Sequence, residues 1–229
     1  MKTIGLIGGM SWESTVPYYS IINEEIKGAL GELSSAKIVL YSVNFEEIEA
    51  YQSAGRWDKA AQLLGDVAKK LEAFGADFII ICTNTMHKIA PEISAMVKIP
   101  VVHIAEATAD KLLEQGVTKA ALLGTKYTMQ QDFYKAKLTA RGIEVLIPDE
   151  GDVEIINHVI FNELCLGIVR DESREEFKRC INYLKEWGAE AVILGCTEIG
   201  MLIKQEDSSL PVFDTTYIHA KRAAELALE

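Results

Sequence analysis

The 229-residue chain has few cysteines, few basic residues and no long apolar run. Its four cysteines lie at 82, 165, 180 and 196 without C-x-x-C spacing, and its four histidines are scattered, so the sequence shows no zinc signature. So few cysteines in a chain of this length do not form a disulfide framework. We therefore expect neither a bound metal ion nor stabilising disulfides.

Positive charge is also scarce. The chain has 23 Lys and Arg against 34 Asp and Glu, a net charge of -11, which argues against nucleic-acid or anionic-membrane partners. No apolar run approaches the roughly 20 residues that a membrane span needs. The start, MKTIGLIGGM, has only a short apolar part and no small-residue cleavage site follows it. We expect a cytoplasmic protein that acts on a small molecule.

Short aliphatic runs alternate with helical patterns along the whole chain. We predict strands over residues 3–9, 37–45 and 77–83, and helices over 15–30 and 57–73. This alternation is typical of an α/β fold in which crossover helices join the strands of a parallel sheet.

The second half of the chain repeats the first. Three segments recur in the same order and at nearly equal spacing: LIGG (6–9) and LLGT (122–125), GADFIIICT (75–83) and GAEAVILGCT (188–197), IPVV (99–102) and LPVF (210–213). We predict two similar α/β lobes. The first lobe comprises residues 1–100 completed by 209–229, and the second comprises residues 101–208.

The repeat places one cysteine at the end of a buried strand in each half, Cys82 and Cys196. Ligands of open parallel sheets bind beyond the carboxyl ends of the strands. If a pseudo-twofold axis relates the halves, the two thiols approach one ligand in the cleft from opposite sides. Inversion of a carbon centre needs this arrangement, because one group removes a proton and the other returns one to the opposite face. Cys180 lies in a helical pattern and is expected to be a core residue.

Polar residues follow both cysteines. Thr83, Asn84 and Thr85 come after Cys82, and Thr197 and Glu198 come after Cys196. Such residues are suited to starting a helix, whose N-terminal N–H groups would lower the pKa of the thiol and bind a substrate carboxylate.

Other readings of these motifs fit less well. A phosphatase-type loop needs an Arg six residues after the cysteine, where this chain has Lys88, and His87 is as easily a helix residue as the activating base of a Cys-His hydrolase. GLIGGMS (5–11) lacks both the G-x-G-x-x-G spacing of dinucleotide-binding loops and the Lys of a P-loop. We expect its glycines to let a ligand approach the backbone.

Five motifs together resemble the aspartate/glutamate racemase family, in its broad-range or aspartate/glutamate-type branch: GLIGGMSWEST (5–15), CTNTMH (82–87), ELCLG (163–167), GCTEIG (195–200) and PVFDT (211–215). The resemblance covers essentially the whole chain. It implies two Rossmann-like lobes with the site in the cleft between them, a homodimer, and racemisation of amino acids without pyridoxal phosphate or another cofactor.

The resemblance also assigns roles to residues. It makes Cys82 and Cys196 the two bases. It implies that the substrate's α-carboxylate and ammonium group are held by Thr83, Asn84 and Thr85 with Met10, and that Thr125 and Thr128 line the site. Of these two threonines we favour Thr128, because Thr125 is also placed to cap the next helix.

The sequence departs from the family pattern where dedicated aspartate racemases carry an Arg and a Lys that grip the distal carboxylate. The matching positions are Ile48 and Cys165. Losing both cations removes charge-assisted hydrogen bonds worth about 1.5–3 kcal/mol each. Gln52 lies nearby in the sequence and is a candidate for binding a side-chain carboxylate or amide, so the preferred amino acid is left open.

Two alternatives remain at the level of sequence. A maleate isomerase, or another cysteine-dependent enzyme acting on small carboxylic acids, would use a similar cysteine pair. A non-catalytic module that binds small acids would share the two-lobed architecture but leave the repeated cysteines unexplained.

Overall fold

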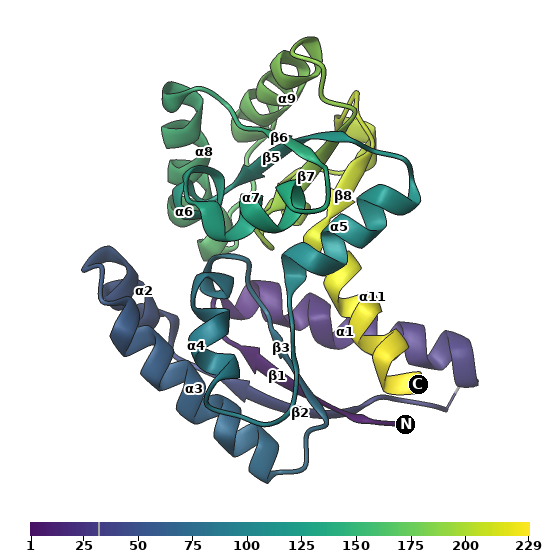
Figure 1. Ribbon diagram of the computed structural model, residues 1–229. Coiled ribbons are helices and arrows are strands. Elements are labelled where there is room, and N and C mark those ends of the chain that lie inside the picture. The colour runs from purple at the N-terminus through teal and green to yellow at the C-terminus, as the bar shows by residue number, and fades with distance from the viewer. Residues whose placement is uncertain (32) are drawn as a thin grey trace. The chain divides into compact units, whose positions relative to one another are not determined.

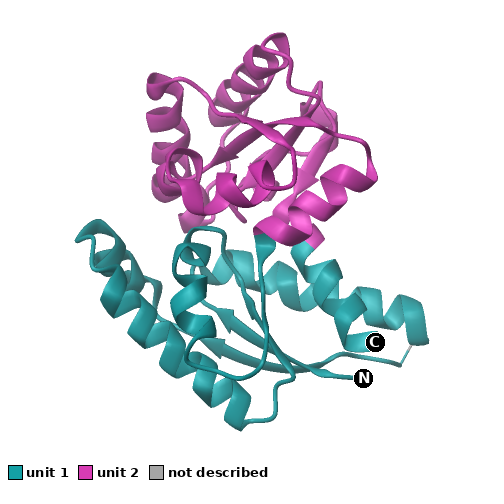
Figure 2. Ribbon diagram, viewed as in Figure 1, with its two compact units in different colours: residues 1–104, 219–229 teal, residues 105–218 magenta. Residues whose placement is uncertain are grey.

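The computed structural model describes residues 1–31 and 33–229. The chain divides into two compact units, coloured separately in Figure 2. Unit 1 comprises Met1–Ile104 and His219–Glu229, and unit 2 comprises Ala105–Ile218. The last helix, α11 (Thr215–Leu228), begins in unit 2 and continues in unit 1.

Unit 1 contains a four-stranded parallel sheet in the order β2-β1-β3-β4 (Figure 1). Its strands are β1 (Thr3–Gly8), β2 (Lys37–Ser42), β3 (Phe78–Ile81) and β4 (Val101–Val102). Its other helical elements are α1 (Trp12–Leu30), α2 (Phe45–Ser53), α3 (Trp57–Ala73), η1 (Thr85–Ile89) and α4 (Ala90–Ser94).

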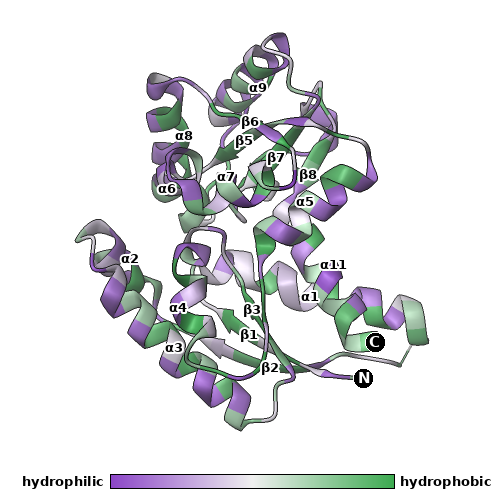
Figure 3. Ribbon diagram, viewed as in Figure 1, coloured by the Kyte–Doolittle hydropathy of each residue, from purple (hydrophilic) through white to green (hydrophobic). Residues whose placement is uncertain are grey.

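Helices cover both faces of this sheet, and the alternation of side chains explains why. Leu6 and Ile80 pack in one cluster with Ile22 of α1 and with alanines of α11. Ile7 and Ile81, one position along each strand, point to the other face and pack with residues of α3. Strands that are buried on both faces read as continuous apolar runs, which Figure 3 shows as green arrows between helices of mixed colour.

Unit 2 repeats the topology with a second four-stranded parallel sheet, in the order β6-β5-β7-β8. Its strands are β5 (Lys119–Gly124), β6 (Glu144–Leu146), β7 (Ala191–Gly195) and β8 (Val212–Asp214). Its helical elements are α5 (Ile104–Glu114), α6 (Lys126–Gln130), α7 (Asp132–Thr139), α8 (Glu150–Asn162), η2 (Leu164–Leu166), α9 (Asp171–Glu186), α10 (Ile199–Leu202) and η3 (Gln205–Asp207).

The predicted α/β class with two similar units is confirmed, because both units have the same strand order and the strands of each sheet are parallel. The prediction for 57–73 matches α3 at both ends. The second strand ends at Ser42 rather than 45, because Asn44 caps α2 through its side chain. The pseudo-twofold relation and the cleft stay predictions.

The limits of the two compact units differ from the lobe limits predicted from the sequence. Unit 1 resumes at His219, whereas the sequence placed residues from 209 onward in the first lobe. The difference arises because β8 pairs with β7 and thereby extends the sheet of unit 2. Among residues 1–31 and 33–229, no helix is long and apolar enough to cross a membrane.

Candidate active site

Cys82 lies directly beyond the carboxyl end of β3, beside the end of β1. Its backbone N–H donates to the carbonyl of Ile7 at 2.9 Å, which continues the pairing between the two strands. The side chain is fully buried and packs in the cluster on the α1 face of the sheet. Burial raises the pKa of the Cys82 thiol well above its ordinary value.

The glycine loop after β1 packs tightly against neighbouring residues of unit 1. A Cβ on Gly8 would lie 2.4 Å from Cγ2 of Thr15, and Gly9, at φ +89°, has no room for a Cβ beside the backbone of Val43. Gly9 N–H donates to Oγ1 of Thr15 at 2.8 Å, which anchors the loop to the start of α1. These glycines are therefore required by protein contacts, in addition to any ligand contact expected from the sequence. Met10, the next residue, is buried in the unit 1 core.

Thr83, Asn84 and Thr85 are buried in the segment that joins Cys82 to η1. His87 fixes this segment, because its Nδ1 donates to the carbonyl of Thr83 at 2.8 Å while its Nε2 accepts from the backbone N–H of Ile104 at 3.2 Å. Both ring nitrogens are thus used, and burial, followed by the charge of His103, lowers the pKa of His87 to about 3. His87 is therefore a neutral structural residue. Neither of its ring nitrogens is left to activate a thiol, as the base of a Cys-His hydrolase must do.

Gln52 reaches the same segment from α2. It is 5% exposed, and its Nε2 donates to Sδ of Met86 in η1 at 2.9 Å. Ile48, one turn earlier on α2, is fully buried in the unit 1 core. The side chain at position 48, which the family resemblance matched to a cation-bearing position, is therefore part of the core.

In unit 2, Cys196 takes the place that Cys82 has in unit 1, directly beyond the carboxyl end of β7. Two glycines allow close approach of the strands beneath it. A Cβ on Gly124 would lie 2.8 Å from the carbonyl oxygen of Gly195, and one on Gly195 would lie 2.6 Å from Cδ1 of Leu122. The LLG and ILG runs of the repeat therefore support the cysteine through tight packing of β5 against β7.

The Cys196 thiol is hydrogen-bonded to a carboxylate. Its Sγ donates to Oε2 of Glu198 at 2.9 Å, and Thr197 Oγ1 donates to the same oxygen at 2.9 Å. Burial, then the charge of Glu198, then Cys165, raise the pKa of Cys196 well above its ordinary value. The sequence suggested Glu198 only as a helix-starting residue and gave it no role toward the thiol or the substrate. The signal for it was present, since it stands two positions after the repeated cysteine.

The expectation that helix N-termini lower the pKa of both thiols is wrong, because burial raises the pKa of both. Cys82 is followed by the 3-10 helix η1 and Cys196 by α10, which spans only Ile199–Leu202. Such short elements sum few peptide dipoles, whereas the loss of water around a buried thiol opposes its ionisation strongly. Burial therefore outweighs the helix ends.

Thr125 caps α6, as its sequence position suggested. Its Oγ1 accepts from the backbone N–H of Thr128 at 3.3 Å, and the two hydroxyls are 3.2 Å apart. Thr128 is fully buried beneath the glycines of β5 and β7. Cys165, in η2, is partly buried against the unit 2 core.

The candidate residues thus form two groups, one at the sheet end of each unit. Met10, Gln52 and the Cys82 segment belong to unit 1, whereas Thr125, Thr128, Cys165 and the Cys196 segment belong to unit 2. Convergence of the two groups on one substrate stays a prediction. Within residues 1–31 and 33–229, no three His, Cys, Asp or Glu side chains are grouped as metal ligands.

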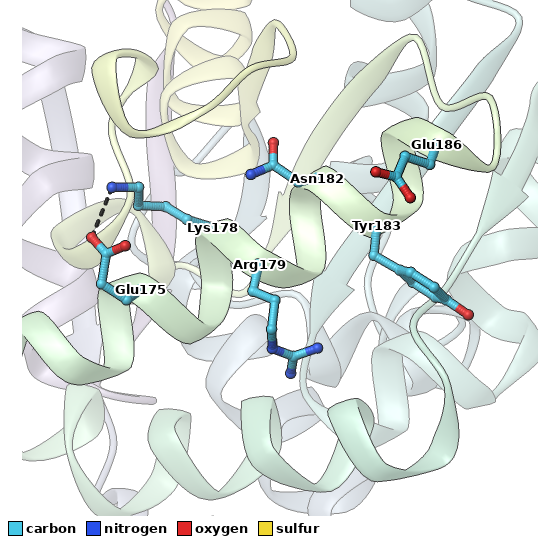
Figure 4. A pocket seen from close by; sticks show the side chains of 6 residues that line it. All are labelled: Glu175, Lys178, Arg179, Asn182, Tyr183 and Glu186. Carbon is cyan, nitrogen blue, oxygen red and sulfur yellow. Dashed lines mark hydrogen bonds and ion pairs between the residues drawn. The ribbon is translucent and has the colours of Figure 1, made fainter.

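Two surface hollows contain neither cysteine of the repeat. One of about 460 Å³ runs along α9, and Figure 4 shows polar side chains spread along this single helix: Glu175, Lys178, Arg179, Asn182, Tyr183 and Glu186. The other, of about 230 Å³, lies between α1 and β2 and is lined by Trp12, Thr15, Val16, Tyr19, Leu40 and Ser42. The first is lined by side chains of a single helix, among them the ion pair of Lys178 with Glu175, and the second is mostly apolar.

The model of the Asp/Glu/Hydantoin racemase family matches residues 7–223. The chain belongs to this family. A crystal structure assigned to the Asp/Glu racemases, from Yersinia pestis, is 53% identical over the whole of both chains, with a TM-score of 0.93. An aspartate racemase homologue from Pyrococcus horikoshii OT3 is 39% identical over the whole of both chains, with a TM-score of 0.86.

A further relative is the broad specificity amino-acid racemase RacX of Bacillus subtilis, 27% identical over 95% of each chain. Membership of the racemase family confirms the predicted family and enzyme class, an isomerase of the racemase type. It also sets aside the alternative of a non-catalytic binding module.

Proposed function

We propose that this racemase interconverts L- and D-amino acids by a two-base mechanism in which Cys82 and Cys196 act on opposite faces of Cα. The observation that carries the proposal is the recurrence of a buried cysteine at the same place in two units of identical strand order. Each thiol stands where parallel sheets present groups to a ligand. No cofactor is required, because the thiols themselves exchange the proton.

The chemistry follows from the two protonation states. One cysteine acts as thiolate, takes the α-hydrogen as a proton and becomes a thiol. The other, initially a thiol, gives its proton to the opposite face of the planar carbanion and becomes a thiolate. Burial raises the pKa of both thiols, so the thiolate, once formed, is a strong base for a weakly acidic carbon. The ammonium group of a bound substrate offsets the cost of forming that thiolate.

The buried polar residues beside Cys82 are suited to holding the reacting end of the substrate. Thr83, Asn84 and Thr85, with the backbone at Met10, would bind the α-carboxylate and ammonium group. The side chain would face Gln52 and Cys165, with no cation at position 48 or 165. A range of amino acids, including uncharged ones, fits this set better than strict preference for aspartate, and the broad specificity named for RacX supports it.

We also propose a homodimer, as the family resemblance implies, and two folding lobes. The first crossing of the chain between them is near residue 100, as the sequence predicted, and the second follows β8, because β8 belongs to the sheet of unit 2. Sedimentation analysis would test the homodimer. Limited proteolysis followed by mass spectrometry of the fragments would test the lobes.

Incubation in D₂O tests the mechanism. The purified protein, without added cofactor, is given each enantiomer of Asp, Glu, Asn, Gln, Met and homoserine, and chiral chromatography with mass spectrometry reports inversion and deuterium at Cα. We expect inversion with deuterium uptake, and a loss of about 10²–10⁴-fold or more in Cys82→Ser and in Cys196→Ser. Cys180→Ser is the matched control, because Cys180 is a buried cysteine of unit 2 outside the proposed site.

Full racemisation by either Ser variant would refute the two-base mechanism. Absence of exchange with every amino acid, together with turnover of maleate, would favour a cysteine-dependent isomerase of another acid.

A further inference from the structure

The hydrogen bond between Cys196 and Glu198 makes the two halves of the proposed base pair chemically unequal. Glu198 is 2% exposed, and one of its carboxylate oxygens, Oε2, accepts from both the Cys196 thiol and the Thr197 hydroxyl. A thiol that donates to a buried carboxylate holds its proton, because ionisation would leave two negative charges side by side in a site shielded from water.

The repeat puts an amide at the corresponding position of unit 1. Both cysteines are followed by a threonine, but two positions on, unit 1 has Asn84 where unit 2 has Glu198. Asn84 is as buried as Glu198, at 1% exposed. The segments 82–84 and 196–198 thus both consist of a cysteine, a threonine and a buried polar residue, and they differ in the charge of the third residue.

The surroundings of the two thiols differ accordingly. Burial raises the pKa of Cys82. At Cys196 two titratable groups act in addition to burial, namely Glu198 and the Cys165 thiol, and both oppose ionisation. Ionisation of Cys196 is thus opposed by an anion that has no counterpart two residues after Cys82.

We propose that Glu198 is the positioning residue of Cys196, which it holds as the protonated member of the pair, so that Cys82 is the cysteine that forms the thiolate when substrate binds. This inference rests on the proposed two-base function. In one inversion Cys82, having released its thiol proton to water, takes the α-proton, and Cys196 gives its own proton to the opposite face. The product state has a Cys82 thiol and a Cys196 thiolate beside Glu198. The starting form is restored when Cys82 releases the proton it took and Cys196 takes one from water.

The difference between the two cysteines affects kcat and KM separately but not the ratio of kcat/KM in the two directions. Two enantiomers have equal free energy, so the ratio of kcat/KM in the two directions is fixed for every variant. The asymmetry instead appears as unequal kcat and unequal KM for the L- and D-substrate. Replacing the Glu198 carboxylate by an amide makes the two halves alike, and we expect it to bring the two kcat values and the two KM values closer together.

The deciding experiment is the pH dependence of alkylation of each cysteine in the full chain, measured with a small haloacetamide and quantified peptide by peptide. In Glu198→Gln we expect the Cys196 profile to move to lower pH by about one unit or more, with the Cys82 profile unchanged. In the reciprocal variant Asn84→Asp we expect the Cys82 profile to move to higher pH. Asp152→Asn is the matched control, because Asp152 is another buried carboxylate of unit 2 and is ion-paired with Arg179.

An unchanged Cys196 profile in Glu198→Gln, or equal shifts at both cysteines, would overturn the inference. Circular dichroism and the Cys82 profile report whether the variant is folded. The alkylation result does not require turnover, so it separates the two proposals. A protein that racemises no amino acid but shows the Cys196 shift refutes the function alone, and one that racemises without the shift refutes the role of Glu198 alone.

Discussion

The Tyr18 hydroxyl and Nδ1 of His219 lie 2.9 Å apart, although 201 positions separate the two residues in the chain. His219 Nε2 donates to the carbonyl of Val102 at 3.0 Å, so Nδ1 is the acceptor for Tyr18. The bonds tie α11 to α1 and β4 within unit 1. His219 lies 5.5 Å from His87 between ring centroids, and burial, followed by the charge of His87, lowers the pKa of His219 to about 3.

These two histidines predict a loss of stability in acid. Both have a folded-state pKa of about 3 against an ordinary value of 6.5, so the unfolded chain binds their protons first. Their contribution is fully present above pH 6.5 and is lost as the pH falls from 6.5 toward 3. Each lowers the free energy of unfolding by up to about 1.4 kcal/mol per pH unit in this window. Urea denaturation at several pH values measures the slope.

The variant His219→Gln should reduce that slope by up to about 1.4 kcal/mol per pH unit. His158→Gln is the control, because His158 is exposed on α8. Equal slopes in the two variants would contradict the assignment of His219 as a buried neutral group.

Two glycine variants test whether the close packing of β5 against β7 is needed to position Cys196. A Cβ at Gly195 would meet Leu122 and the carbonyl of Leu123, so Gly195→Ala should force β5 and β7 apart, lower the free energy of unfolding by roughly 1–3 kcal/mol and reduce kcat. Gly28, within α1, has open space at the same position, and Gly28→Ala should stabilise the protein by about 0.5–1 kcal/mol. Thermal unfolding and racemisation assays compare the two variants. If Gly195→Ala changed neither stability nor kcat, the close packing of β5 against β7 at Gly195 would be ruled out.

Variants of Thr125 test whether this residue only caps α6 or also binds substrate. Thr125→Ala removes the acceptor for the Thr128 N–H and should cost about 0.5–2 kcal/mol of stability, whereas Thr125→Ser should retain most of it. Denaturation midpoints and KM are measured for both variants. An unchanged KM in Thr125→Ala would refute the predicted contact of Thr125 with substrate and leave only the cap.

A cation at position 165 should narrow the substrate range. Cys165→Lys would place a positive charge close enough to Cys196 to act on it, as the Cys165 thiol does. The family resemblance matches this position to the lysine that would bind the distal carboxylate of aspartate. We expect kcat/KM for aspartate to rise relative to methionine by roughly 10- to 100-fold, from one charge-assisted hydrogen bond of about 1.5–3 kcal/mol. Cys165→Met, long but uncharged, is the control. Equal preference in the two variants would show that the side chain of the substrate lies elsewhere.

The sequence by itself determined the architecture and the cysteine pair. Strands buried on both faces must be continuously apolar, and helices that cover them must be amphipathic, so FIII and the 57–73 pattern were readable without coordinates. The repeat then placed Cys82 and Cys196 at equivalent strand ends. These features depend on local periodicity and on order along the chain.

Tertiary structure decided the state of the groups at those strand ends. The pKa of a thiol depends on how much water surrounds it and which charges lie nearby, so helix-start residues suggested lowered values while burial raises them. The same is true of Ile48, a core residue, and of His87, whose two ring nitrogens are bound by backbone groups 4 and 17 positions away. The role of Glu198 required the observed 2.9 Å contact with Cys196, because adjacency in sequence does not fix where a carboxylate points.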